Sequence, residues 1–249
     1  MKRKAVLIGT QGGWADSKFL PGVSKDVEAY KALLLSPVGG AWREDEIETL
    51  VDKRELAVRT AITGAGKADY SFVVFCGHGF EDTDTDSPHI ELKERVFFDA
   101  GILDTKATLR TLILDSCRDL LSAREVALHL SLEAALFEAT GTGLSALRCR
   151  AEFDRRLRLC KPGLVEIHSC APGESAVDLS EGGLYSTKLL EAATSWADKA
   201  RPHRFPDALG ISAAHLAAVP EVKRLSKGKQ NPTIRQSRSA HDVPFAVVA

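Results

Sequence analysis

The sequence predicts an α/β protein in which a mostly parallel sheet lies between helices. Short apolar runs alternate along the chain with longer segments whose apolar residues recur at helical spacing. Strands that alternate with helices are typical of parallel sheets, because each parallel connection has to cross a face of the sheet. The 249 residues can bury a sizeable core and show no internal repeat, so we expect one domain over residues 1–249.

The first elements follow from apolar spacing and from helix signals. Residues 4–10 predict a buried strand, and a helix should begin at Gly22, with apolar residues at helical spacing, and end before Pro37. Asp52 and Glu55 have the spacing of a capping box, which predicts a second helix that runs to Gly64.

The remaining elements continue the alternation. We expect core strands at 70–76, 109–114 and 164–168, a small strand or hairpin at 90–98, and a terminal strand at 244–248. Helices are predicted at 123–159, with a break near Gly141, and at 184–196 and 206–218.

Two motifs follow the two central strands: Gly77-His78-Gly79 and Asp115-Ser116-Cys117. Neighbouring parallel strands present their carboxyl ends at one edge of a sheet, where ligands bind. An imidazole and a thiol are therefore expected side by side, as a nucleophilic cysteine requires. Either residue alone is more typical of a core or loop position, and their pairing after two strands favours catalysis.

The order of these motifs resembles the caspase and metacaspase family of cysteine peptidases, including its short prokaryotic members. The similarity extends to residues 20–27 and to the segment 182–185 beyond the cysteine. It implies a caspase-hemoglobinase-like fold with about six mostly parallel strands sandwiched between helices. It also implies an endopeptidase in which Cys117 attacks the scissile carbonyl and His78 is general acid and base. The backbone N–H groups of Gly79 and Cys117 would form the oxyanion hole.

The resemblance also indicates a substrate preference. In this family the residue two before the nucleophile lines the first specificity pocket, as glutamine in caspases and aspartate in metacaspases. This chain has Asp115 there, and Asp26 matches a second metacaspase pocket acid. Because a buried carboxylate attracts a guanidinium and repels an acidic side chain, we expect cleavage after Arg or Lys. Arg118-Asp119 follows neither branch of the family, so the branch stays open.

Two other functions remain open: a caspase-fold protease with Asp preference, and a catalytically silent caspase-like scaffold used for binding. The structural alternative for Asp26 is a solvated or capping acid on the first helix, and for Asp115 a strand-end acid. The other cysteines are interpreted as structural thiols: Cys76, Cys149, Cys160 and Cys170.

The helical connection 122–161 is a candidate processing region. Caspase relatives are often cut here, so an Arg-specific enzyme would be able to cleave itself at one of its arginines. The alternative is a basic, solvated helix face. The arginines concerned are Arg148, Arg150, Arg155, Arg156 and Arg158.

Composition limits the partners and cofactors. A net charge of −1 gives no reason to expect nucleic acid or an anionic membrane, and the apolar run after the basic start is too short for a signal peptide or membrane span. We therefore expect a cytoplasmic protein. No cofactor is expected, since the cysteines lack zinc-ligand spacing and the turn after the first strand lacks phosphate-loop patterns.

Calcium activation is the alternative, because Asp82, Asp84 and Asp86 superficially resemble a calcium loop without its glycine and distal glutamate. The expected partners are a protein or peptide substrate and an activator or operon partner protein. The resemblance leaves both a monomer and a homodimer open. The resemblance suggests an effector role in defence or regulated cell death.

Overall fold

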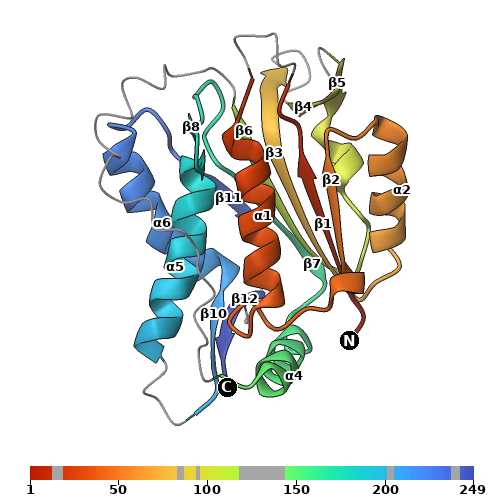
Figure 1. Ribbon diagram of the computed structural model, residues 1–249, viewed down its shortest axis with the longest axis vertical. Helices are drawn as coiled ribbons and strands as arrows, with labels where there is room; N and C mark the ends of the chain where they lie inside the picture. Colours follow the sequence, from red (N-terminus) through yellow and green to blue (C-terminus); the bar gives the residue numbers. More distant parts are fainter. Residues whose placement is uncertain (13–18, 83–86, 94–95, 118–143, 201–204, 237–241) are drawn as a thin grey trace.

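The computed structural model describes residues 1–12, 19–82, 87–93, 96–117, 144–200, 205–236 and 242–249. Figure 1 shows a central sheet with helices on both faces. Within these residues, the main sheet has eight strands, and its central path runs β11-β7-β6-β3-β1-β2. All neighbours on this path are parallel except β11, which runs antiparallel to β7. The predicted sandwich of mostly parallel strands between helices is confirmed.

The strands of this sheet lie where the apolar runs predicted them, except for two strands at 47–51 and 233–236 that the sequence did not predict. They are β1 (Arg3–Gly9), β2 (Ile47–Val51), β3 (Tyr70–Asp82), β4 (Ser87–Lys93), β5 (Val96–Asp99), β6 (Leu109–Cys117), β7 (Gly163–His168) and β11 (Thr233–Gln236).

The helices pack on the sheet in two unequal layers (Figure 1). The thinner layer consists of α2 (Glu55–Ala65) and the short 3-10 helix η2 (Ala100–Leu103). In the described parts of the chain, the opposite face carries the larger core and four helices, which are α1 (Gly22–Leu35), α4 (Ala146–Leu157), α5 (Leu184–Ala200) and α6 (Ile211–Leu225).

Strand periodicity explains why there are two cores. Successive side chains of a strand point to opposite faces, so one buried strand supplies both cores in alternation. In β3, Phe72 and Val74 belong to the core under α1, whereas Val73 and Phe75 belong to the core under α2. Both faces are thus covered, which is why the central strands are continuous apolar runs.

Several boundaries differ from the sequence-based expectations for reasons of pairing. The segment 206–218 is not helical from its start, because β10 (Asp207–Gly210) pairs antiparallel with β12 (Pro244–Val248) before α6 begins. The terminal strand is therefore part of this separate pair rather than an edge of the main sheet. The prediction of a capping box at Asp52 was also wrong. Oδ1 of Asp52 accepts the N–H of Gln11 at 2.9 Å, and Arg54 occupies the N-cap of α2.

The most consequential difference concerns β3, which does not stop at residue 76. It passes the rim of the parallel sheet and continues to Asp82, because Gly79 to Asp82 pair antiparallel with β4. β4 in turn pairs with β5, so the predicted hairpin is present as β4–β5. The result is an antiparallel extension that rises from the strand carrying His78.

Candidate active site

The two predicted catalytic residues lie at the same edge of the sheet. His78 and Cys117 are register partners across the neighbouring parallel strands β3 and β6. Neighbouring strands are about 4.8 Å apart, so the two backbone positions are adjacent. The His78 side chain is half-buried, whereas the side chain of Cys117 lies outside what the structure describes. The backbone placement is the one that the strand ends predict.

Gly79 is held in a tight position beside this pair. A Cβ built on Gly79 would lie 2.7 Å from the carbonyl oxygen of His89 and 2.9 Å from the Cβ of Ser116. Such distances are not tolerated, so any side chain here would push β3 away from β4 or β6. Glycine keeps the backbone of the candidate oxyanion hole close to the end of the nucleophile strand.

The two candidate pocket acids converge from different elements. Asp26 lies on α1 and Asp115 on β6, and both are almost fully buried, at 4% and 7% exposure. The N–H of Gly183 donates to both carboxylate oxygens of Asp26, at 3.0 and 2.9 Å. Asp115 accepts the N–H of Ser186 at 3.1 Å and also the Ser186 hydroxyl. Asp26 is therefore neither solvated nor a helix cap.

A single glycine shows how close the two carboxylates are. A Cβ on Gly183 would lie 2.7 Å from Oδ2 of Asp115 and 3.2 Å from Oδ2 of Asp26. Gly183 belongs to a small hairpin made of β8 (Asp178–Leu179) and β9 (Gly182–Gly183), which lies against α1. The hairpin backbone thus fills the space between the acids.

The electrostatics of this cluster disfavour two negative charges. Burial raises the pKa of Asp26 well above its usual range, and the charge of Asp115 raises it further. Burial likewise raises the pKa of Asp115, against the opposing effect of its Ser186 hydrogen bonds. Asp178 is a third member, because burial and the charge of Asp115 raise its pKa to about 7.

No positive charge balances this cluster among the residues that the structure describes. Their ion pairs with Lys, Arg or His involve other carboxylates and none of Asp26, Asp115 and Asp178. The same residues include no group of three His, Cys, Asp or Glu arranged to hold a metal ion. Among the described residues, the cluster is thus a buried acidic group that no cationic side chain pairs with.

Cys76 lies beside the acids and is a poor nucleophile. Burial raises the pKa of its thiol well above the usual value, and the charges of Asp26 and Asp115 add to this effect. The thiol therefore stays protonated at neutral pH. The described cysteines other than Cys117 are free thiols: Cys76, Cys149, Cys160 and Cys170.

Sequence reasoning missed three members of this cluster. Besides Asp178 and Ser186, Tyr30 on α1 takes part, since its hydroxyl lies 3.3 Å from the Ser186 hydroxyl. The helical spacing of Tyr30 indicates only a core position. Asp178 and Ser186 flank the Gly182-Gly183 motif, and no residue pattern connects them with an acid on β6. Their role depends on how the chain folds back over α1.

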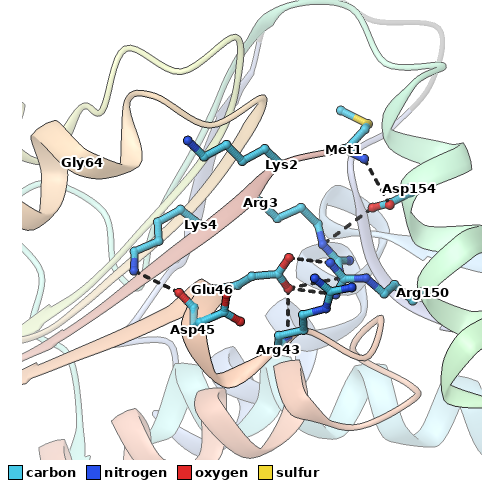
Figure 2. A pocket seen from close by; sticks show the side chains of 10 residues that line it. All are labelled: Met1, Lys2, Arg3, Lys4, Arg43, Asp45, Glu46, Gly64, Arg150 and Asp154. Atoms are coloured by element: carbon cyan, nitrogen blue, oxygen red, sulfur yellow. Dashed lines mark hydrogen bonds and ion pairs between the residues drawn. The ribbon is translucent and has the colours of Figure 1, made fainter.

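A second group of charged residues lies at the opposite edge of the sheet, where β1 begins. A cavity of about 600 Å³ lies there. Figure 2 shows the side chains that line it. Arg150 of α4 makes a two-pronged contact with Glu46, including Nη1–Oε2 at 2.8 Å, and also donates to the carbonyl of Ala41 at 3.0 Å. Nε of Arg3 on β1 lies 3.6 Å from Oδ1 of Asp154 on α4.

Aromatic rings complete this second group. The Arg3 guanidinium lies 4.6 Å from the centre of the Trp42 ring and 5.1 Å from that of Phe153. Contacts of this kind are favourable when the cation is desolvated, as Arg3 is. The cluster anchors α4 to the start of β1. It lies at the end of the sheet away from His78, because Arg3 pairs with Tyr70 at the start of β3.

The candidate processing region is described only in part. Residues 118–143 lie outside the described residues, and the remainder contains α4. On this helix Arg155 and Arg156 pair with Glu152, and Arg150 pairs with Glu46.

The aspartates that resemble a calcium loop are Asp82, Asp84 and Asp86, and only Asp82 is among the described residues. In the described part of the chain no helix has the length and apolar character needed to cross a membrane.

Comparison with known proteins establishes the family. The family model described as the caspase domain matches residues 2–244, nearly the whole chain. The chain belongs to the caspase domain family. This is a family of cysteine peptidases, as the order of the histidine and cysteine motifs implied. No curated protein sequence matches the chain.

Solved structures show the same fold at low sequence identity. A protein from Geobacter sulfurreducens matches with a TM-score of 0.61 and 18% identity over 100% of both chains. The Drosophila initiator caspase Dronc matches with a TM-score of 0.57 and 9% identity, over 97% of this chain and 80% of the other. Caspase-1 from Spodoptera frugiperda has a TM-score of 0.54 and 12% identity, over 94% and 88%. These likenesses support the caspase-like fold.

Proposed function

We propose that this caspase-domain chain is a cysteine endopeptidase that cleaves protein or peptide substrates after Arg or Lys. The observation that carries the proposal is the pair of buried carboxylates, Asp26 and Asp115, which lack a cationic partner among the described residues. Asp115 precedes Cys117 by two residues on the same strand. A basic side chain bound there would hold its own carbonyl next to the nucleophile.

The chemistry follows from the two strand ends. The thiol of Cys117 gives its proton to the imidazole of His78, and the sulfur then bonds to the scissile carbonyl carbon. The N–H groups of Gly79 and Cys117 stabilise the negative oxygen that forms. As the C–N bond breaks, His78 returns the proton to the departing amine. Water then hydrolyses the thioester, with His78 accepting its proton.

Binding requires a rearrangement of the β8–β9 hairpin. The backbone of Gly183 fills the space between the carboxylates and donates to Asp26, so a substrate side chain reaches the acids only after the hairpin shifts. A guanidinium would replace the lost N–H donor with stronger, charge-assisted hydrogen bonds. It would also favour the ionised form of acids whose pKa values are raised in the free protein.

Fluorogenic peptides that end in Arg, Lys or Asp test this proposal. We expect cleavage after Arg and Lys, none after Asp, and complete loss in Cys117→Ala. Cleavage after Asp alone would show an Asp-preferring protease and would contradict the role of the acid pair. If no peptide is cleaved in a thiol-dependent way, with or without calcium, the chain is a binding scaffold.

Self-processing, if the enzyme is Arg-specific, should avoid α4. Protease sites bind substrates in extended form, and the helical backbone of α4 would have to unwind while its Arg150–Glu46 contact breaks. We therefore expect a new amino terminus within residues 118–145 when purified protein is incubated and sequenced. A Cys117→Ala variant that is still clipped would contradict self-cleavage.

A further inference from the structure

An aromatic cluster stands on the antiparallel extension next to His78. Phe80 stacks on His89 of β4, with ring centres 5.0 Å apart and planes inclined by 15°. Phe97 of β5 meets Phe80 edge-on, with ring centres 5.1 Å apart. Phe80 and His89 are register partners, and Phe80 contacts both other rings, so the cluster spans β3, β4 and β5. We call Phe80, His89 and Phe97 the aromatic ladder.

The ladder is open to solvent although it is large and apolar. Phe80 is 39% exposed and Phe97 41%, and Val96 next to Phe97 is 42% exposed. The Nδ1 atom of His89 lies 3.2 Å from the carbonyl oxygen of Ser87, which fixes its ring. Clustered aromatic rings that stay accessible on a strand surface are typical of a recognition surface.

The position of the ladder relative to the proposed chemistry indicates its occupant. In the proposed complex the substrate's basic side chain points toward Asp26 on α1 and Asp115 on β6. The departing amine takes its proton from His78, so the peptide that follows the scissile bond leaves over β3. Phe80 is two residues beyond His78, a distance of about 7 Å along the strand, or two residues of extended peptide.

We propose that the aromatic ladder is a subsite for an aromatic or large aliphatic side chain of the substrate, at the second residue after the scissile bond. This inference rests on the proposed endopeptidase function and extends it to the leaving-group side. The alternative is that the ladder only stabilises the β3–β4–β5 ribbon through cross-strand contacts. The two roles predict different results with substrates that end at the scissile bond.

Two substrate types separate these roles. The first is an Arg peptide with a coumarin amide, which has no residues after the scissile bond. The second is a pair of internally quenched peptides that share the same Arg and differ only in Phe or Ser two residues after the scissile bond. For the wild type we expect kcat/KM to be about tenfold higher with Phe than with Ser, because one aromatic side chain is buried.

The variants Phe80→Ser and Phe97→Ser should abolish the Phe preference and leave the coumarin rate within about twofold of wild type. Leu56→Ser is the matched control, because Leu56 is an exposed apolar residue on α2 and should alter neither substrate. Equal losses on the coumarin and quenched peptides would show a structural role and overturn the subsite. A wild type that cleaves the coumarin peptide without any Phe preference would overturn it as well. If the coumarin peptide is not cleaved, both this inference and the proposed function fail.

Discussion

The substitution Asp26→Asn should make the protein more stable and less active at the same time. Asn has nearly the same shape as Asp, and its carbonyl oxygen can still accept the N–H of Gly183. The change removes one of two buried ionisable carboxyl groups that face each other across that glycine. The substitution therefore separates the loss of stability that the acid pair causes in the free protein from its contribution to substrate binding.

The stability gain comes from the raised pKa of Asp26. A carboxyl group whose pKa is higher in the folded than in the unfolded protein lowers stability as pH rises above its unfolded pKa. At pH 8 the folded protein bears this penalty, and Asn does not. Relief of a strained functional site is commonly worth about 1–2 kcal/mol, which raises Tm by about 2–8 °C in a domain of this size.

The activity loss comes from the missing partner for the guanidinium. Truncating one member of a buried charge pair costs about 2–5 kcal/mol, and the lower end applies here because Asp115 remains. A loss of about 2–3 kcal/mol corresponds to about 30- to 150-fold in kcat/KM for an Arg peptide. The loss should be smaller for a peptide with an uncharged residue in place of the Arg.

Thermal unfolding at pH 8 and kcat/KM with coumarin peptides measure the two effects. Asp45→Asn is the control, since Asp45 is an exposed carboxylate at the opposite edge of the sheet and should change neither quantity. A lower Tm in Asp26→Asn would show that the carboxylate is needed for folding. An unchanged kcat/KM for Arg peptides would refute its role in the pocket.

The other predictions test the oxyanion position, the acids' protonation and the anchor of α4. Gly79→Ala should reduce kcat by about 100-fold, because its Cβ would lie 2.9 Å from that of Ser116 and displace one oxyanion donor; a near wild-type kcat would exclude this position from the site. KM for Arg peptides should decrease as the pH rises from about 6 to about 8. Acids with raised pKa values, including Asp178 with a pKa of about 7, bind a cation only once they are deprotonated. A KM that does not change with pH in the wild type would contradict this. Phe153→Ala should cost about 3–5 kcal/mol in urea unfolding, because the ring is buried against the Arg3 guanidinium, and a loss below about 1 kcal/mol would mean that α4 is anchored elsewhere.

The sequence predicted the central part of the fold because local patterns determine it. The apolar runs of β1, β3, β6 and β7 are long enough to identify buried strands, and the strand ends then place His78 opposite Cys117. The convergence of Asp26 and Asp115 was expected only from the family resemblance, since nothing local connects a helix residue with a strand end.

The parts that were missed depend on contacts between distant segments. β2 and β11 are short and half-polar, and they are strands because they pair with β1 and β7 at the two edges of the sheet. Asp178 lies in a polar stretch whose hairpin is recognisable only once it lies against α1. Pairing partners far away in the chain thus override local propensity at the edges.

The anchoring of α4 also has a consequence for a cleaved chain. Cys117 ends a strand at one edge of the sheet, whereas α4 is clamped at the other edge by Arg3 and Glu46. Described segments before residue 118 and after residue 145 contribute to the larger core, and β6 and β7 are adjacent strands. A nick between these points would therefore leave a two-piece particle that migrates as one body in native buffers and separates only under denaturation.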